Sequence, residues 1–163
     1  MNNTPITIVL DRLRSAHNTG NIFRVAEAVG AKEIIACGYT PCPPHPKLAK
    51  TAMGAENMVP CRNFMNSFEA VKALKAEGIK KVLAVETTGD STCAWEYEYE
   101  FPLALVFGNE ALGIMEETLS ICDGVLSLPM FGTKSSINVG NCAAVVLYSV
   151  MAFLKKHNTL LLS

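Results

Sequence analysis

The segment 128–139 holds the densest group of side chains in this chain that could bind a polar ligand. It contains the hydroxyl groups of Ser135 and Ser136 and the amide of Asn138, and it follows a strand-like run at 124–128. Loops often bind ligands because their backbone groups are not used by the hydrogen bonds of a helix or sheet. In an α/β sheet, the loop after a strand lies at the carboxyl edge, where ligands bind. The residues therefore predict a polar ligand site at this loop.

Two further polar segments follow strand-like runs. In the segment 17–24, Asn18 begins an expected helix and Arg24 lies roughly 9 Å further along its axis, so both could face one phosphate. In the segment 108–113, two glycines flank Asn109 and Glu110 and allow the backbone to approach a ligand closely. Each segment also has a plainer alternative, namely a helix cap, a surface arginine or a tight turn.

The elements that must position these segments alternate between strands and helices. Hydrophobic patterning predicts strands at 6–10, 33–37, 58–61, 81–85, 103–107 and 125–128. It predicts helices at 19–29, with Asn18 or Thr19 as the N-cap, and at 48–53, 67–78, 115–121 and 138–156. This alternation favours an α/β fold with a mostly parallel sheet flanked by helices, as one domain over 1–163. The polar segments would then meet at one edge of the sheet.

Charge is unevenly distributed along a chain whose net charge is only −1. Residues 1–81 hold eleven Lys and Arg against six Asp and Glu, whereas residues 82–133 hold nine Asp and Glu and no Lys or Arg. Such an uneven distribution of charge can present one basic face of the protein to a polyanion. Solvent-exposed helix faces can also differ in the sign of their charge without any such function.

Several functions are disfavoured by what the chain lacks. No G-x-G-x-x-G or Walker motif is present, and the only histidines are His17, His45 and His157, so neither a dinucleotide fingerprint nor a Ser/His/Asp triad is suggested. The six cysteines have no metal-ligand spacing and predict reduced, mostly buried thiols in a cytoplasmic protein without a metal. The uncharged run 135–154 has the length of a membrane span, but its polar residues favour a buried helix packed on a partner subunit, with no membrane.

Together the three polar segments resemble the motifs of the SpoU/TrmH branch of the SPOUT RNA methyltransferases. The matched residues are Asn18-x-Gly20-x-x-x-Arg24, then Leu105-Val106-Phe107-Gly108-Asn109-Glu110-x-x-Gly113, then Leu128-Pro129-Met130-x-Gly132-x-x-x-Ser136-Ile137-Asn138-Val139. Their order and spacing agree with the family, and the likeness covers nearly the whole chain. The resemblance implies an α/β domain with a C-terminal trefoil knot, which periodicity could not indicate because knots are almost absent from proteins.

The resemblance also implies an activity, the transfer of a methyl group from S-adenosylmethionine to a ribose 2′-hydroxyl of RNA. The cofactor would be bound by Val85, Gly108, Leu128, Met130, Ser136 and Ile137. Arg24 would be the central catalytic residue, surrounded by Asn18, Glu110, Ser136 and Asn138. Because a guanidinium is a poor base, Arg24 would orient the target and stabilise charge rather than accept the proton.

The same resemblance implies a homodimer in which the motif-one arginine comes from the neighbouring subunit. With no separate RNA-binding domain expected, RNA would contact Arg12, Arg14, Arg24, Lys47, Lys50, Arg62 and Lys134. The small size of the expected domain favours tRNA over rRNA as the substrate. Two alternatives stay open, a non-catalytic RNA-binding member of the fold and an α/β enzyme that uses another nucleotide. The intact polar residues of the three motifs disfavour the first, and the missing phosphate loop disfavours the second.

Overall fold

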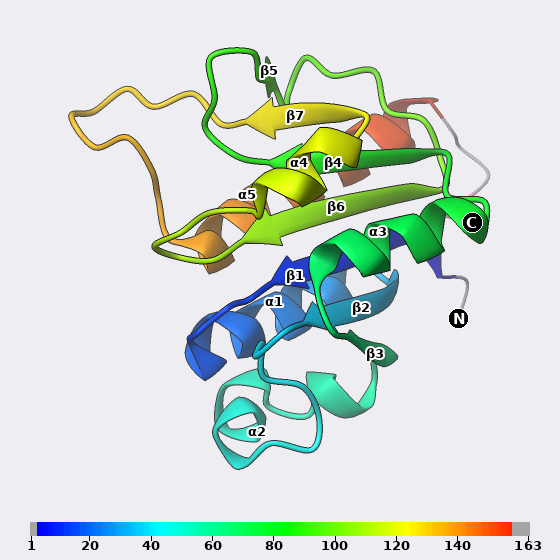
Figure 1. Ribbon diagram of the computed structural model, residues 1–163, viewed down its shortest axis with the longest axis vertical. Helices are drawn as coiled ribbons and strands as arrows, with labels where there is room; N and C mark the ends of the chain where they lie inside the picture. Colours follow the sequence, from blue (N-terminus) through cyan, green and yellow to red (C-terminus); the bar gives the residue numbers. More distant parts are fainter. Residues whose placement is uncertain (1–2, 158–163) are drawn as a thin grey trace.

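Seven parallel strands form one sheet in the computed structural model, which describes residues 3–157 (Figure 1). The strands are β1 Thr4–Asp11, β2 Ala31–Cys37, β3 Cys61–Phe64, β4 Lys81–Val85, β5 Thr92–Cys93, β6 Leu103–Gly108 and β7 Gly124–Ser127. Their order across the sheet is β3-β2-β1-β6-β4-β7-β5, and every pairing is parallel. The predicted α/β fold with its mostly parallel sheet is therefore confirmed, while the trefoil knot stays a prediction.

The helices cover both faces of this sheet. They are α1 Ala16–Ala28, α2 Pro46–Ala52, α3 Ser67–Ala76, α4 Glu116–Ile121 and α5 Val139–His157, with a 3₁₀ turn at Ala55–Asn57. Side chains alternate along β1, so that Ile8 belongs to the core under α1 and α5 while Val9 belongs to the core under α3. Both strand faces are buried, which explains the near-continuous apolar runs in the sequence.

The strand register brings the ends of distant segments to one edge. Asp11 at the end of β1 pairs with Cys37 of β2 and Gly108 of β6, and Val85 of β4 pairs with Phe107 and Leu126. The loops that follow β1, β4, β6 and β7 consequently leave the sheet at the same edge, on the left of Figure 1. This is the edge at which the sequence predicted a ligand site.

Helix α1 begins earlier than the sequence predicted. Ser15 is its N-cap, because the Ser15 hydroxyl accepts a hydrogen bond from the Asn18 backbone N–H at 3.1 Å. The expected cap at Asn18 or Thr19 is therefore wrong, and the Asn18 side chain is left available for tertiary contacts. The expected strand at 58–61 is also displaced, since β3 begins only at Cys61.

Helix α5 is long and apolar enough to cross a membrane, judged by length and composition alone. Its inner face nevertheless packs on the sheet, where Ala143, Val146 and Val150 are fully buried. Its outer face exposes Tyr148 and Val145. The helix thus serves as a core element on one side and presents an apolar surface on the other.

Candidate functional site

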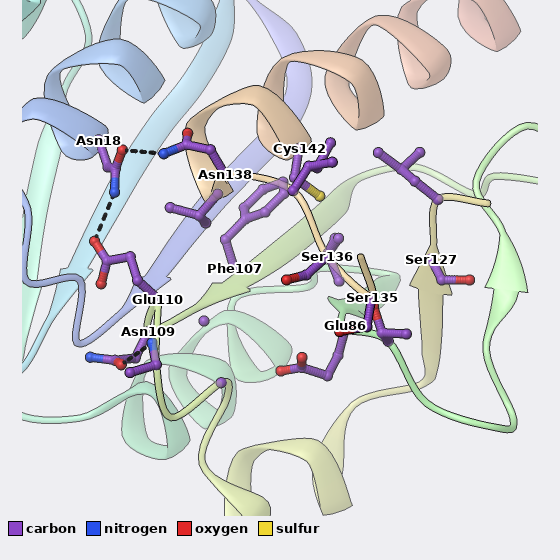
Figure 2. A pocket seen from close by; sticks show the side chains of 18 of the residues that line it. Asn18, Glu86, Phe107, Asn109, Glu110, Ser127, Ser135, Ser136, Asn138 and Cys142 are labelled. Carbon is purple, nitrogen blue, oxygen red and sulfur yellow. Dashed lines mark hydrogen bonds between the residues drawn. The ribbon is translucent and has the colours of Figure 1, made fainter. Parts of the chain in front are cut away.

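A pocket of about 550 Å³ lies at the carboxyl edge of the sheet (Figure 2). It is formed by the loops after β4, β6 and β7 together with the first turns of α1 and α5. Its volume is within the range of sites that bind cofactors and other small molecules. All three polar segments contribute residues to the lining of this cavity.

Nearly all the residues predicted to bind the cofactor or to take part in catalysis line this pocket. The set expected to bind the cofactor is present in full, as Val85, Gly108, Leu128, Met130, Ser136 and Ile137. Of the predicted catalytic set, Asn18, Glu110, Ser136 and Asn138 line the pocket and Arg24 does not. Arg24 is exposed on α1, opposite the face that buries Ile22 and Ala26.

A chain of hydrogen bonds joins one residue from each polar segment. The Asn138 amide Nδ2 donates to Asn18 Oδ1 at 2.9 Å, and Asn18 Nδ2 donates to Glu110 Oε1 at 3.0 Å (Figure 2). Asn18 is only 9% exposed, and its amide lies between two partners, Glu110 and Asn138, that are themselves exposed at the rim of the pocket. Its orientation is fixed because Glu110 can only accept while Asn138 donates.

Glu110 also accepts hydrogen bonds from backbone N–H groups at the start of α1. Its carboxylate accepts the backbone N–H groups of Arg14 at 3.0 Å and Ser15 at 3.2 Å. Burial alone would raise the pKa of Glu110, but the hydrogen bonds from Arg14, Asn18 and Ser15 outweigh it and hold the pKa below its ordinary value. Glu110 is therefore an ionised anchor for the first turn of α1.

The loop between Gly108 and Gly113 closes on itself. Backbone hydrogen bonds run from Asn109 N to Gly113 O at 3.2 Å and back from Gly113 N to Asn109 O at 3.0 Å. A Cβ atom at Gly108 would lie 2.5 Å from Ile114 N and 2.6 Å from Gly113 C. Gly108 is thus required by the packing of its own loop, whereas the sequence suggested that a ligand needs the space.

Other pocket residues were missed by the sequence analysis. Glu86 and Thr87 follow β4, Ser127 ends β7, and Cys142 lies in the first turn of α5. Burial, and to a smaller extent the charge of Glu86, raises the pKa of the Cys142 thiol to about 11. The position of Glu86 directly after a strand was a signal that could have identified it, because such positions lie at the carboxyl edge.

Two of the predicted RNA contacts are engaged in ion pairs. The Arg12 guanidinium donates to both oxygens of Asp11 and to the Gly113 carbonyl. Arg62 pairs with Glu33 at 2.7 Å and with Glu77 at 2.8 Å. These contacts offset part of the charge of both arginines, whose contact with RNA stays a prediction.

The other predicted RNA contacts are exposed. Arg14, Arg24, Lys47, Lys50 and Lys134 are open to solvent, and no ion pair involves them within residues 3–157. Helices α1 and α2 pack together at Gly20 and Thr51, which brings Arg24, Lys47 and Lys50 onto neighbouring helices. Lys134 lies on the pocket loop itself.

The cysteines differ in burial from the expectation. All six are free thiols, but only Cys37 is fully buried and the other five are half-buried. In the described part of the chain, no three His, Cys, Asp or Glu side chains gather as a metal-binding group.

The fold and the pocket define an α/β protein with a ligand site where several parallel strands end. Comparison with known proteins identifies the family. Residues 5–148 match the SpoU rRNA Methylase family. The chain belongs to this family, as its three polar segments indicated.

Curated relatives are similar in sequence to most of this chain. A tRNA (guanosine(18)-2′-O)-methyltransferase of Thermus thermophilus is 34% identical over 143 residues, which are 88% of this chain and 72% of the relative. A 23S rRNA (guanosine-2′-O-)-methyltransferase RlmB of Vibrio parahaemolyticus is 32% identical over 149 residues, 91% of this chain and 59% of the relative.

A solved structure agrees with the fold. The AdoMet-bound rRNA methyltransferase from Sinorhizobium meliloti superposes with a TM-score of 0.85 at 26% identity, covering 94% of this chain and 58% of that one. Several of these relatives are therefore considerably longer than the region they share with this chain.

Proposed function

We propose that this protein is an S-adenosylmethionine-dependent RNA 2′-O-ribose methyltransferase. The observation that carries the proposal is the Glu110–Asn18–Asn138 chain of hydrogen bonds at the rim of the pocket, which unites the three family motifs in one site. Family membership supports the reaction class, and the names of the relatives supply both tRNA and rRNA as candidate substrates.

The residues of the pocket fit S-adenosylmethionine. Val85, Leu128, Met130 and Ile137 provide apolar walls that suit a flat adenine ring. The described lining contains the carboxylates of Glu86 and Glu110 but no Lys or Arg. A cofactor with a sulfonium, an ammonium and one carboxylate has a net positive charge, so this acidic lining favours it. When bound, the cofactor supplies an electrophilic methyl group.

The protein's part in the reaction is to orient the attacking hydroxyl. We assign Asn18, Ser136 and Asn138 to the polar rim that positions the target ribose beside the pocket, with Glu110 holding Asn18 in place. The bound cofactor would supply the methyl group to the ribose oxygen that these residues orient, and the hydroxyl proton would pass to a phosphate oxygen of the RNA. Alignment of this kind can contribute about 7–11 kcal/mol to lowering the barrier.

Arg24 would bind the phosphate beside the target nucleotide. Its exposure on α1, outside the pocket lining, is consistent with a homodimer in which Arg24 serves the pocket of the neighbouring subunit. The exposed apolar residues Val145 and Tyr148 of α5 provide surface for such an interface. Lys47 and Lys50 on the adjacent α2 would then extend the same basic surface along the RNA backbone.

The test is methyl transfer from labelled S-adenosylmethionine to bulk tRNA and to rRNA in parallel, with nucleoside analysis of the product. A 2′-O-methylated nucleoside from either RNA supports the proposal and identifies the substrate. Binding of the cofactor and of RNA without any transfer would instead favour the non-catalytic RNA-binding alternative. A methylated base in place of a methylated ribose would contradict the reaction class.

A further inference from the structure

Glu86 lies in the pocket but belongs to none of the three polar segments. It directly follows β4, and its backbone N–H continues the β4–β7 ladder by donating to Leu126 O at 3.0 Å. Figure 2 shows its side chain extending from this strand end beside the pocket. The backbone hydrogen bond fixes the position of Glu86, so its carboxylate occupies a defined place in the site.

The two pocket carboxylates differ in how fully their oxygens are used. Both oxygens of Glu110 accept hydrogen bonds from the start of α1. Glu86 Oε2 accepts the Ile114 backbone N–H at 3.0 Å, whereas Oε1 has no hydrogen-bond partner among residues 3–157. An ionised carboxylate can accept about four hydrogen bonds. Glu86 therefore has acceptor capacity that the protein leaves unused inside the pocket.

The neighbours of Glu86 indicate which part of a ligand it meets. Val85, the preceding residue, is one of the apolar side chains that form the walls suited to an adenine ring. Val85 and Glu86 both line the pocket, so a group bound by Glu86 lies close to that apolar slot. In an adenine nucleoside, the group joined directly to the ring is the ribose, whose two hydroxyls are hydrogen-bond donors.

We propose that Glu86 accepts hydrogen bonds from the ribose hydroxyls of the adenosyl cofactor and is a specificity residue for the nucleoside. This inference rests on the proposed function, since it concerns the cofactor of that reaction. Ile114 N holds Oε2 in place, which leaves Oε1 directed to the ligand. The contact selects a ribonucleoside over a deoxyribonucleoside, because a missing hydroxyl leaves the carboxylate oxygen without its partner.

The substitution Glu86→Gln tests the role of the carboxylate oxygen Oε1, which has no partner in the described residues. The glutamine carbonyl can still accept from Ile114 N, so the loop after β6 keeps its contact, while the amide group replaces the other acceptor with a donor. Asp90→Asn is the matched control, because Asp90 lies exposed in the same loop, does not line the pocket, and loses the same charge. Thermal unfolding of both variants shows whether the fold is kept.

The experiment measures dissociation constants by calorimetry for S-adenosylhomocysteine, for 5′-methylthioadenosine and for the 2′-deoxy and 3′-deoxy forms of the latter. 5′-Methylthioadenosine keeps the ribose but lacks the amino-acid part. We expect Glu86→Gln to weaken the binding of S-adenosylhomocysteine and of 5′-methylthioadenosine by a similar factor of about tenfold or more. This is the loss expected for a hydrogen bond to a charged group. At least one deoxy form should bind the wild-type protein weakly, and its affinity should not change further in Glu86→Gln. Asp90→Asn should bind all the ligands with wild-type affinity.

Three outcomes would overturn the inference. Unchanged affinity of Glu86→Gln for both ribonucleosides would remove its role, and weakening of S-adenosylhomocysteine alone would assign Glu86 to the ammonium group. Equal binding of ribo- and deoxynucleosides by the wild type would exclude the contact even if the variant failed to fold. If the wild type bound neither ribonucleoside, the proposed function itself would fail, and this inference with it.

Discussion

The side chains of Asn18 and Asn138, 120 positions apart in the sequence, are joined by a hydrogen bond of 2.9 Å. The same Asn138 side chain caps α5, because its Oδ1 accepts the backbone N–H groups of Gly140 at 2.9 Å and Asn141 at 3.2 Å. One residue thus starts the last helix and fixes the orientation of a residue in the first. The structural and the functional contributions of Asn138 can be separated by mutation.

Asn138→Ala should lower the free energy of unfolding by about 0.5–2 kcal/mol through loss of the cap and should also reduce methyl transfer. Asn138→Asp keeps the capping oxygen but cannot donate to Asn18, so we expect nearly wild-type stability with reduced turnover. Chemical denaturation and single-turnover kinetics measure the two effects. Full turnover in Asn138→Asp would show that the link to Asn18 is not needed for the reaction.

Arg24→Ala should abolish methyl transfer and leave cofactor affinity unchanged, because Arg24 does not line the pocket. Mixing this variant with the impaired Asn138→Ala variant tests whether Arg24 acts across subunits. If it does, the mixed dimers regain one complete site, and activity should return to roughly a quarter of the wild-type value after random exchange. No recovery after verified subunit exchange would place Arg24 and the pocket of one reaction in the same subunit.

Glu110 should contribute a pH-dependent part of the stability. Its pKa in the folded protein lies below the ordinary value of 4.5, so the contribution is present above that pH and is lost as pH falls through the lowered pKa. The stability difference between the wild type and Glu110→Gln should therefore shrink on acidification below about pH 4.5. Because Glu110 is partly exposed, we expect less than about 1 kcal/mol from ionisation. Urea unfolding at several pH values, with Asp90→Asn as the control, measures it.

Gly108→Ala should disrupt the loop that follows β6. The added Cβ would lie 2.5 Å from Ile114 N, a backbone atom that cannot move without displacing the hydrogen bond from Ile114 N to Glu86. We expect lower stability together with weaker cofactor binding, because the loop lines the pocket. Gly132→Ala is the matched control, since a Cβ there meets nothing within 4 Å. Equal effects of the two substitutions on cofactor affinity would contradict this reason.

Gly20→Ala should separate α1 from α2 without touching the pocket lining. Its Cβ would overlap the Thr51 side chain, and it would lie 2.8 Å from Ala52 N, so one helix must shift. Overpacking of this kind costs about 1–3 kcal/mol, which thermal unfolding would detect. Gly89→Ala, where a Cβ meets nothing within 4 Å, should be close to neutral. A stable Gly20→Ala protein would show that the two helices can adjust.

Local patterning by itself determined the order of the main elements and the positions of the three polar segments. The strand predicted at 81–85 coincides with β4, because a short apolar run after a glycine-terminated helix has few other conformations. The same reasoning failed at β5, whose two residues carry no periodic signal. It also misplaced the cap of α1, since Ser15, Asn18 and Thr19 are all good capping residues.

Only the tertiary structure decided which contacts each of these residues makes. The sequence could not show that Arg12 and Arg62 are held by carboxylates, because those pairs depend on side-chain geometry, and for Arg62 on strands and helices far apart in the chain. Nor could it show that Glu110 anchors the start of α1, or that Glu86 presents a carboxylate oxygen to the pocket. Local residue types fix which groups are available, whereas parallel strand pairing brings their ends together and decides which groups contact one another.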